Sequence, residues 1–382
     1  MNIAFFIEQH FDPFAGGVQQ STSKLVKIFN YKRHKTIVIS CSTPCDISIY
    51  DGSNVFHIGL NSIRFQEILY SEEIDLVINQ AGYSFPLSKF LIQNLTVGVK
   101  LINTLRINPL NFYQNHKFII KNFLEKKRLL AFNISLTQKG VLLYHVLKQR
   151  FELSYIIKNV DAFVMLSDRF KPELYQLVPG VKKYDKKIFG INNPFQKPEL
   201  AFETIEKENV ILFVGRLEIS QKRVDLLLEI WMKLHKELPN WQFWVVGHGA
   251  QEKMMKNFCQ EHGLINVKFF GKCKPDNYYL QAKILHMTSS FEGFGNVLVE
   301  AQCYGCVPIL FNSYSAASDI INHDEDGVLI KSFDIQDYVD ATLRLSNNNV
   351  ELKRLSENAY QNADRFAFYN IYKKWDNVFS SL

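Results

Sequence analysis

Two glutamates stand eight positions apart in the stretch SSFEGFGNVLVEAQCYG, residues 289–305. The residue pattern predicts a helix that begins near Asn296 and is capped by Gly305. Glu292 therefore belongs to the preceding loop and Glu300 to the first helical turns. Because a carboxylate only accepts hydrogen bonds, each glutamate suits the hydroxyl groups of a ligand. The helix-start amides between them suit a phosphate, so the predicted ligand is a nucleotide sugar.

The predicted phosphate-binding backbone lies between the two glutamates. It comprises Gly293, Phe294, Gly295, Asn296 and Val297. Simpler interpretations stay open for the glutamates themselves. Glu300 near a helix start interacts favourably with the helix dipole, and Glu292 in a loop is well solvated.

Two cations precede these residues in the stretch FVGRLEISQKRVDLLLEIW. Arg216 directly follows a predicted strand, and Lys222 comes just before an amphipathic helix. A guanidinium fork and a movable ammonium group together suit a diphosphate. The alternative is that both are solvated surface charges.

Glycines mark two further strand ends. Gly16 and Gly17 lie between the first predicted strand and a helix opening near Val18, and Gly247 and Gly249 follow another strand in VVGHGAQEKM. Glycine lets a ligand approach the backbone, although a tight turn needs the same residue. The dinucleotide fingerprint G-x-G-x-x-G is missing, and no acidic residue ends the second strand, which argues against a dehydrogenase.

The elements that position these residues alternate between short apolar runs and helical patterns. Strands are predicted at residues 3–8, 36–40, 75–80, 100–105 and 161–167, and again at 209–215, 242–247, 267–271, 284–290 and 307–311. Apolar runs separated by helices indicate parallel strands buried on both faces. We therefore predict an α/β fold with two doubly wound, Rossmann-like parallel-sheet domains. Ligands of such sheets bind beyond the carboxyl ends of the strands, here in the cleft between two facing domains.

The polar, proline-containing stretch GINNPFQKPEL indicates a linker around residues 192–205. The predicted domains are 1–194, on the acceptor side, and 195–365, which binds the nucleotide sugar. With 382 residues, 47% hydrophobic and 21% charged, the chain is typical of a soluble globular protein. The N-terminus predicts a first strand rather than a signal peptide, so a cytoplasmic location is expected.

Two patterns resemble metal motifs. Cys303 and Cys306 are spaced C-x-x-C without a second pair, which favours packing cysteines. Asp324 and Asp326 in HDEDG have D-x-D spacing, but the Asp-Gly sequence indicates a polar turn. No metal site and no cofactor is predicted; the nucleotide sugar is a co-substrate.

The net charge of +6 is concentrated in one segment. Residues 117–158 contain nine Lys or Arg and two Glu, interleaved with Phe, Leu and Tyr. This composition is typical of a helix that lies on an anionic membrane surface. We expect peripheral binding at the inner face of the cell membrane, and we expect no nucleic-acid partner. The alternative is a solvated helical face.

The chain resembles the retaining glycosyltransferases of family 4, whose two facing Rossmann-like domains form the GT-B arrangement. The matching pieces are GGVQ, INNP, FVGRL with Lys222, VVGHG, SSFEGFGNVLVEA and DGVLI. The resemblance implies that Glu300 holds the ribose hydroxyls and that Glu292 holds the donor sugar. It also implies that Arg216 and Lys222 neutralise the leaving diphosphate, and that residues 366–382 cross back to the first domain as a helix.

The implied reaction transfers a hexose or N-acetylhexosamine, with UDP as the expected carrier, to a glycan or lipid-linked glycan in cell-surface polysaccharide synthesis. One position departs from the family pattern, because Arg106 stands where a histidine is usual. An arginine stays protonated, so it would bind phosphate or an anionic acceptor rather than act as a base. Alternatively, Arg106 is a surface charge. The rival functions are a catalytically weak nucleotide-sugar-binding protein of the same fold and a nucleotide-sugar epimerase.

Overall fold

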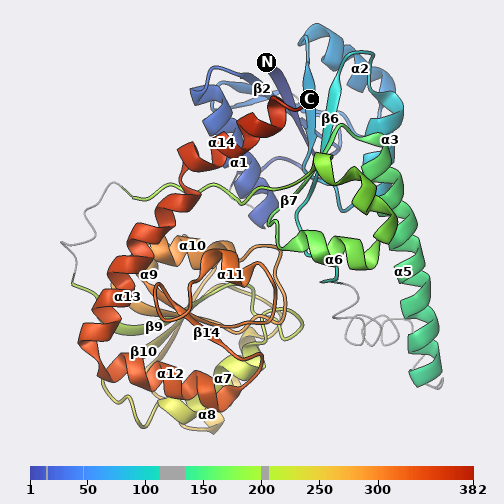
Figure 1. Ribbon diagram of the computed structural model, residues 1–382. Coiled ribbons are helices and arrows are strands. Elements are labelled where there is room, and N and C mark those ends of the chain that lie inside the picture. The colour runs from blue at the N-terminus through green and yellow to red at the C-terminus, as the bar shows by residue number, and fades with distance from the viewer. Residues whose placement is uncertain (14–15, 46, 112–133, 199–205) are drawn as a thin grey trace. The chain divides into compact units, whose positions relative to one another are not determined.

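The computed structural model describes residues 1–13, 16–45, 47–111, 134–198 and 206–382 (Figure 1). Contacts divide the chain into two units, of which the first comprises Met1–Pro194 with Ile371–Leu382 and the second Phe195–Asn370. The second unit thus begins at residue 195, and the chain returns to the first unit at residue 371. No helix in the described residues is both long and apolar enough to cross a membrane.

The first unit contains an eight-stranded sheet in the order β3-β4-β2-β1-β5-β6-β7-β8. Its strands are β1 Asn2–Ile7, β2 Lys35–Ser40, β3 Ser48–Tyr50, β4 Ser53–His57, β5 Leu76–Asn79, β6 Lys100–Leu105, β7 Ala162–Met165 and β8 Ile188–Gly190. Every pairing is parallel except that of β3 with β4. Helices connect the parallel strands, which is why the central strands β1, β5 and β6 are almost wholly buried.

The helices of the first unit are α1 Gly16–Tyr31, α2 Ser62–Ser71, α3 Phe85–Asn94, α5 Ile134–Asn159, α6 Phe170–Leu177, the 3-10 helix η1 Pro179–Lys187, and α14 Phe368–Phe379, most of which belongs to this unit. Helix α14 packs Trp375 against Phe29 of α1, with ring centroids 5.8 Å apart. The hydroxyl group of Tyr372 lies 2.8 Å from Nε2 of His34. The predicted return of the C-terminal helix to the first domain is therefore confirmed.

The second unit contains a six-stranded parallel sheet in the order β11-β10-β9-β12-β13-β14. Its strands are β9 Glu208–Val214, β10 Gln242–Val246, β11 Val267–Gly271, β12 Ala282–Met287, β13 Val307–Phe311 and β14 Val328–Ile330. Its helices are α7 Val224–Leu234, α8 Glu252–Glu261, α9 Asp276–Gln281, α10 Asn296–Cys303, α11 Ala317–Ile320, α12 Ile335–Asn347, α13 Asn349–Asn362 and the 3-10 helix η3 Ala363–Phe366. The apolar face of α7, with Leu227 and Trp231 buried, covers this sheet.

Each sheet has a topological switch point, where the strand order reverses. In the second unit the chain proceeds outward from β9 to β11 and then returns to β12 on the other side of β9. In the first unit β1 lies between β2 and β5 in the same way. The predicted fold class of two doubly wound parallel sheets is confirmed. Ligands of such sheets bind at the carboxyl ends of the strands beside the switch point.

Candidate functional site

The loops that follow β9 and β12 meet at the switch point of the second unit. The backbone amide of Ser290 donates to the carbonyl oxygen of Gln221 at 2.8 Å. The hydroxyl group of Thr288 donates to the carbonyl oxygen of Lys222, also at 2.8 Å. Because these bonds join the two loops, residues that lie seventy positions apart in the chain become neighbours.

The predicted residues Lys222 and Glu292 form an ion pair at this junction. The Nζ atom of Lys222 lies 2.5 Å from Oε1 of Glu292, and the two side chains are 12% and 10% exposed. Their burial reduces solvent screening, so the charges interact more strongly than a surface pair does. The interpretation of Glu292 as a solvated loop charge is therefore wrong.

Gln221 links this ion pair to the predicted cation Arg216. Its amide nitrogen donates to Oε2 of Glu292 at 3.0 Å, and its amide oxygen accepts from Arg216 at 2.7 Å. Arg216 also pairs with Glu218 at 3.1 Å, and its side chain is 64% exposed. Sequence reasoning missed Gln221, a neutral residue within the quoted loop whose bridging role depends on the fold.

The loop before α10 is shaped by close contacts. Gly295 has φ of +93°, and a Cβ atom there would lie 2.5 Å from the hydroxyl oxygen of Tyr314. That hydroxyl group donates to the carbonyl oxygen of Phe294 at 3.2 Å, and the Phe294 side chain is buried. Phe294 thus anchors the loop in the core, and only its backbone is suited to a phosphate. Helix α10 begins at Asn296, as predicted.

Glu300 lies one turn into α10, where it accepts a hydrogen bond from the hydroxyl group of Tyr279 at 3.0 Å. Tyr279 is buried in α9, and this burial, with the nearby carboxylate, raises the pKa of its phenol well above the usual value. The phenol therefore stays protonated and donates to Glu300. Tyr279 was missed because nothing in its sequence context distinguishes it from an ordinary core tyrosine.

Close backbone packing requires glycine at the predicted positions of the second unit, Gly247 and Gly249. A Cβ atom on Gly247 would lie 1.8 Å from the carbonyl oxygen of Gly215, and one on Gly249 would lie 2.4 Å from that of Leu217. The amide of Leu217 donates to the carbonyl oxygen of His248 at 2.9 Å. These glycines let the loop after β10 pack against the loop that carries Arg216. They shape the site whether or not a ligand contacts them.

The remaining predicted positions belong to the first unit. Gly16 starts α1 two residues before the expected helix start and has φ of +59°, which favours glycine. Gly16 and Gly17 are both exposed, and a Cβ atom on Gly16 would meet nothing within 4 Å. This open surface at a helix N-terminus has room for a ligand.

Arg106 follows β6 and is 8% exposed, so the interpretation as a surface charge is wrong. Its guanidinium group donates to Oε1 of Gln80 through Nε at 2.8 Å and to Oδ1 of Asn193 through Nη1 at 2.7 Å. Both partners are neutral. Burial lowers the pKa of Arg106 to about 9, which still leaves it charged at neutral pH.

The residues of the two motifs with metal-like spacing have structural contacts. Asp324 pairs with Arg344 at 2.5 Å, and buried Asp326 pairs with Arg365 at 3.1 Å and caps the amide of Asn322. Cys303 and Cys306 are both buried. Burial raises the pKa of Cys306 to about 12, as expected for a packing cysteine.

Residues 196–362, which include Arg216, Lys222, Glu292 and Glu300, match the family model described as Glycosyl transferases group 1. The chain is 26% identical over 234 residues to the poly(ribitol-phosphate) alpha-N-acetylglucosaminyltransferase of Staphylococcus aureus, covering 59% of this chain and 46% of that protein. It is 29% identical over 198 residues to a Campylobacter jejuni protein, covering 51% of this chain and 55% of that one. That protein is named GalNAc-alpha-(1->4)-GalNAc-alpha-(1->3)-diNAcBac-PP-undecaprenol alpha-1,4-N-acetyl-D-galactosaminyltransferase.

The chain thus spans about half the length of these curated relatives. Among solved structures, Anabaena HepE in complex with UDP-glucose has a TM-score of 0.72 and 15% identity, with 100% of both chains covered. Such a likeness concerns the fold. Together these findings confirm the resemblance to glycosyltransferases and the predicted GT-B fold class, while the assignment to family 4 stays a prediction.

The first prediction concerns the cations. Replacing Lys222 with alanine should weaken UDP binding by about 1.5–3 kcal/mol, or roughly 10- to 150-fold, because a charge-assisted hydrogen bond to phosphate is lost. Arg216→Ala should act in the same direction. Calorimetry measures both, with Lys236→Ala, an exposed lysine of the same unit, as the control. Unchanged affinity in both variants would show that the diphosphate binds elsewhere.

The second prediction separates the glutamates. Glu300→Ala should weaken binding of free UDP, because the proposed ribose contact is lost. Glu292→Gln should spare UDP and remove mainly the sugar-dependent gain of UDP-sugar over UDP, since its partner Gln221 can still bond an amide. Competition binding with UDP and UDP-sugar provides the comparison. Equal losses of UDP affinity in both variants would contradict the assignment of the sugar end.

Proposed function

We propose that this protein is a retaining glycosyltransferase of the cytoplasm. It moves a hexose or N-acetylhexosamine from UDP to a glycan or lipid-linked glycan acceptor in cell-surface polysaccharide synthesis. The observation that carries the proposal is the cluster of Arg216, Gln221, Lys222 and Glu292 at the switch point of the second unit. The family match over the same residues supports it.

The cluster suits the chemistry of glycosyl transfer. When the bond between C1 of the sugar and the phosphate oxygen breaks, positive charge develops on the ring and negative charge on the diphosphate. Lys222, Arg216 and the first amides of α10 stabilise the leaving diphosphate, in a reaction that uses no metal. The carboxylate of Glu292, fixed by Lys222 and Gln221, accepts hydrogen bonds from the sugar hydroxyls.

On the acceptor side, the first unit provides a buried positive charge. Arg106 bonds the neutral side chains of Gln80 and Asn193, so its charge is not cancelled by these partners. A phosphate or carboxylate of an acceptor would offset the cost of burying the guanidinium group. This chemistry suits a lipid-linked glycan, whose glycan is attached through phosphate.

The third prediction tests the reaction. Incubation with a panel of UDP-sugars should give slow hydrolysis of one of them, with retained configuration at C1 in the product. Glu292→Gln should lower the rate at least tenfold, whereas the surface variant Lys236→Ala should not. Binding of a UDP-sugar without turnover would favour the catalytically weak binding protein. Conversion to a second UDP-sugar would favour the epimerase.

Peripheral membrane binding is the second part of the proposal. Leu143, Tyr144, Leu147 and Phe151 on α5 are between 53% and 65% exposed, beside the exposed basic residues Lys139 and Lys148. Four large apolar side chains along one helix form a surface patch of the kind that contacts membranes. The expected basic residues Lys117, Lys121, Lys126, Lys127 and Arg128 lie outside the described residues.

The fourth prediction tests this patch. The protein should co-sediment with vesicles that contain anionic phospholipid at low salt and be released at high salt, because salt screens the basic residues. Leu147→Glu should reduce binding severalfold. Val350→Glu, at an 83% exposed position of the second unit, should leave it unchanged. Equal binding of both variants to the vesicles would show that α5 does not contact lipid.

A further inference from the structure

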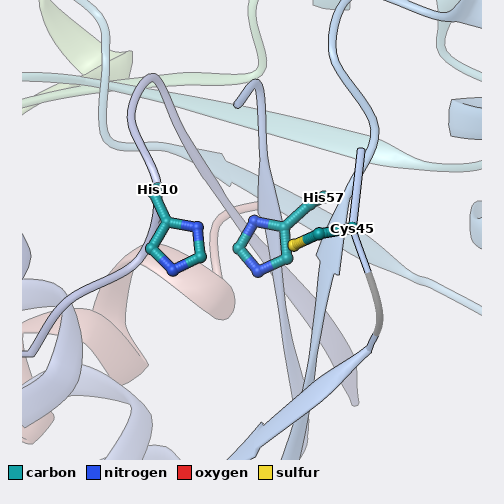
Figure 2. Close-up of side chains that lie close together, drawn as sticks. All are labelled: His10, Cys45 and His57. Carbon is teal, nitrogen blue, oxygen red and sulfur yellow. The ribbon is translucent and has the colours of Figure 1, made fainter. Parts of the chain in front are cut away.

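Three side chains with metal-binding atoms meet at one edge of the sheet in the first unit, as Figure 2 shows. They are His10, Cys45 and His57, and one ligand atom of each lies within 4.8 Å of the others. His57 ends β4, His10 follows β1 and Cys45 follows β2. These strands run parallel, so their carboxyl ends bring three separate loops together.

The local structure prepares His57 to act as a ligand. Its Nδ1 atom lies 2.9 Å from the hydroxyl oxygen of Ser42, which leaves Nε2 for a metal ion. Such an outer hydrogen bond fixes the ring of a metal-binding histidine.

The loop that carries His10 is held by α1. The side-chain amide of Gln19 donates to the carbonyl oxygen of His10 at 2.8 Å and accepts from the amide of Asp12 at 2.9 Å. The rings of His10 and His57 are stacked with centroids 4.4 Å apart. The backbone positions of both histidines are therefore set before any ion binds.

We propose that His10, Cys45 and His57 form a binding site for Zn²⁺. Two imidazoles and a thiolate are borderline to soft ligands that select zinc over magnesium or calcium. In tetrahedral coordination the ligand atoms would lie roughly 3.3–3.7 Å apart, given bonds of about 2.0–2.3 Å. The exposed side chains of His10 and Cys45 can close the difference by rotation, because neither is packed in the core.

A cavity of about 410 Å³ lies beside Cys45 and His57 and is also lined by Arg64 and Glu67. These two residues form an ion pair at 3.1 Å, so Glu67 is directed to Arg64. The fourth ligand is therefore water or a group of a bound molecule. His10 lies on the segment that leads from β1 to Gly16 and Gly17 at the start of α1. Bound zinc would connect this segment to the ends of β2 and β4.

The sequence could not show this site. Its residues are separated by 35 and 12 positions, far from the C-x-x-C spacing that drew attention to Cys303 and Cys306. The three side chains meet only because the strand order places β4 beside β2 and β2 beside β1. Zinc binding at this edge does not depend on the proposed glycosyl transfer.

The fifth prediction concerns metal binding by the full chain, with its thiols kept reduced. Titration with ZnCl₂ should show one site, and Co²⁺ should give the near-ultraviolet charge-transfer band of a cobalt thiolate. Cys45→Ser should abolish the band and lower zinc affinity at least tenfold, and His10→Ala should lower the affinity similarly. Cys273→Ser, an exposed free cysteine of the second unit, is the matched control and should change neither.

Cys45 and His10 are exposed, so their variants should fold even if His57→Ala does not. Excess Mg²⁺ should not displace the cobalt band. The proposal is overturned if no band forms, if the band survives Cys45→Ser, or if His10→Ala and Cys45→Ser bind zinc as tightly as the original protein. Since the readout is metal binding itself, these outcomes do not depend on whether the protein transfers sugars.

Discussion

The ion pair of Lys222 and Glu292 joins the two chain segments that leave the second sheet on either side of its switch point. Burying two charges costs free energy, which close contact and the amide of Gln221 offset. Removing one partner would leave an uncompensated buried charge, which typically costs about 3–5 kcal/mol. The loop before α10, and through it the position of Glu300, therefore depends on this contact.

The same pair sets the electrostatics of the site. Two cations, Arg216 and Lys222, are balanced by two carboxylates, Glu218 and Glu292, so these four side chains carry no net charge together. An ammonium group has three donors, and the contact with Glu292 uses one of them. A diphosphate would therefore compete with Glu218 for exposed Arg216 and share Lys222 with Glu292. The nearby amides of α10 would supply the positive potential that these balanced side chains lack.

Strand ends and charged residues are the features that could be predicted from the sequence. Arg216, Lys222 and Glu292 were identifiable because parallel strands place the residues after them along one edge of a sheet. Gln221 and Tyr279 were missed because a neutral amide and a core tyrosine gain their roles only from three-dimensional neighbours. Strands β3, β4 and β8 were not predicted because each contains only two consecutive apolar residues, and β14 spans only three residues. All ten strands that were predicted are present.

Arg106 differs from Lys222 in that its positive charge has no partner of opposite charge among the described residues. Its guanidinium group is buried, but its hydrogen bonds go to neutral Gln80 and Asn193, and no carboxylate in the described residues pairs with it. Neutral acceptors satisfy the N–H groups without cancelling the charge, and the lowered pKa reflects that uncompensated cost. Burying the charge costs stability, and an anion bound beside it would gain a strong, weakly screened partner. Binding of an anion would offset this cost, and the anion-binding role of Arg106 stays a prediction.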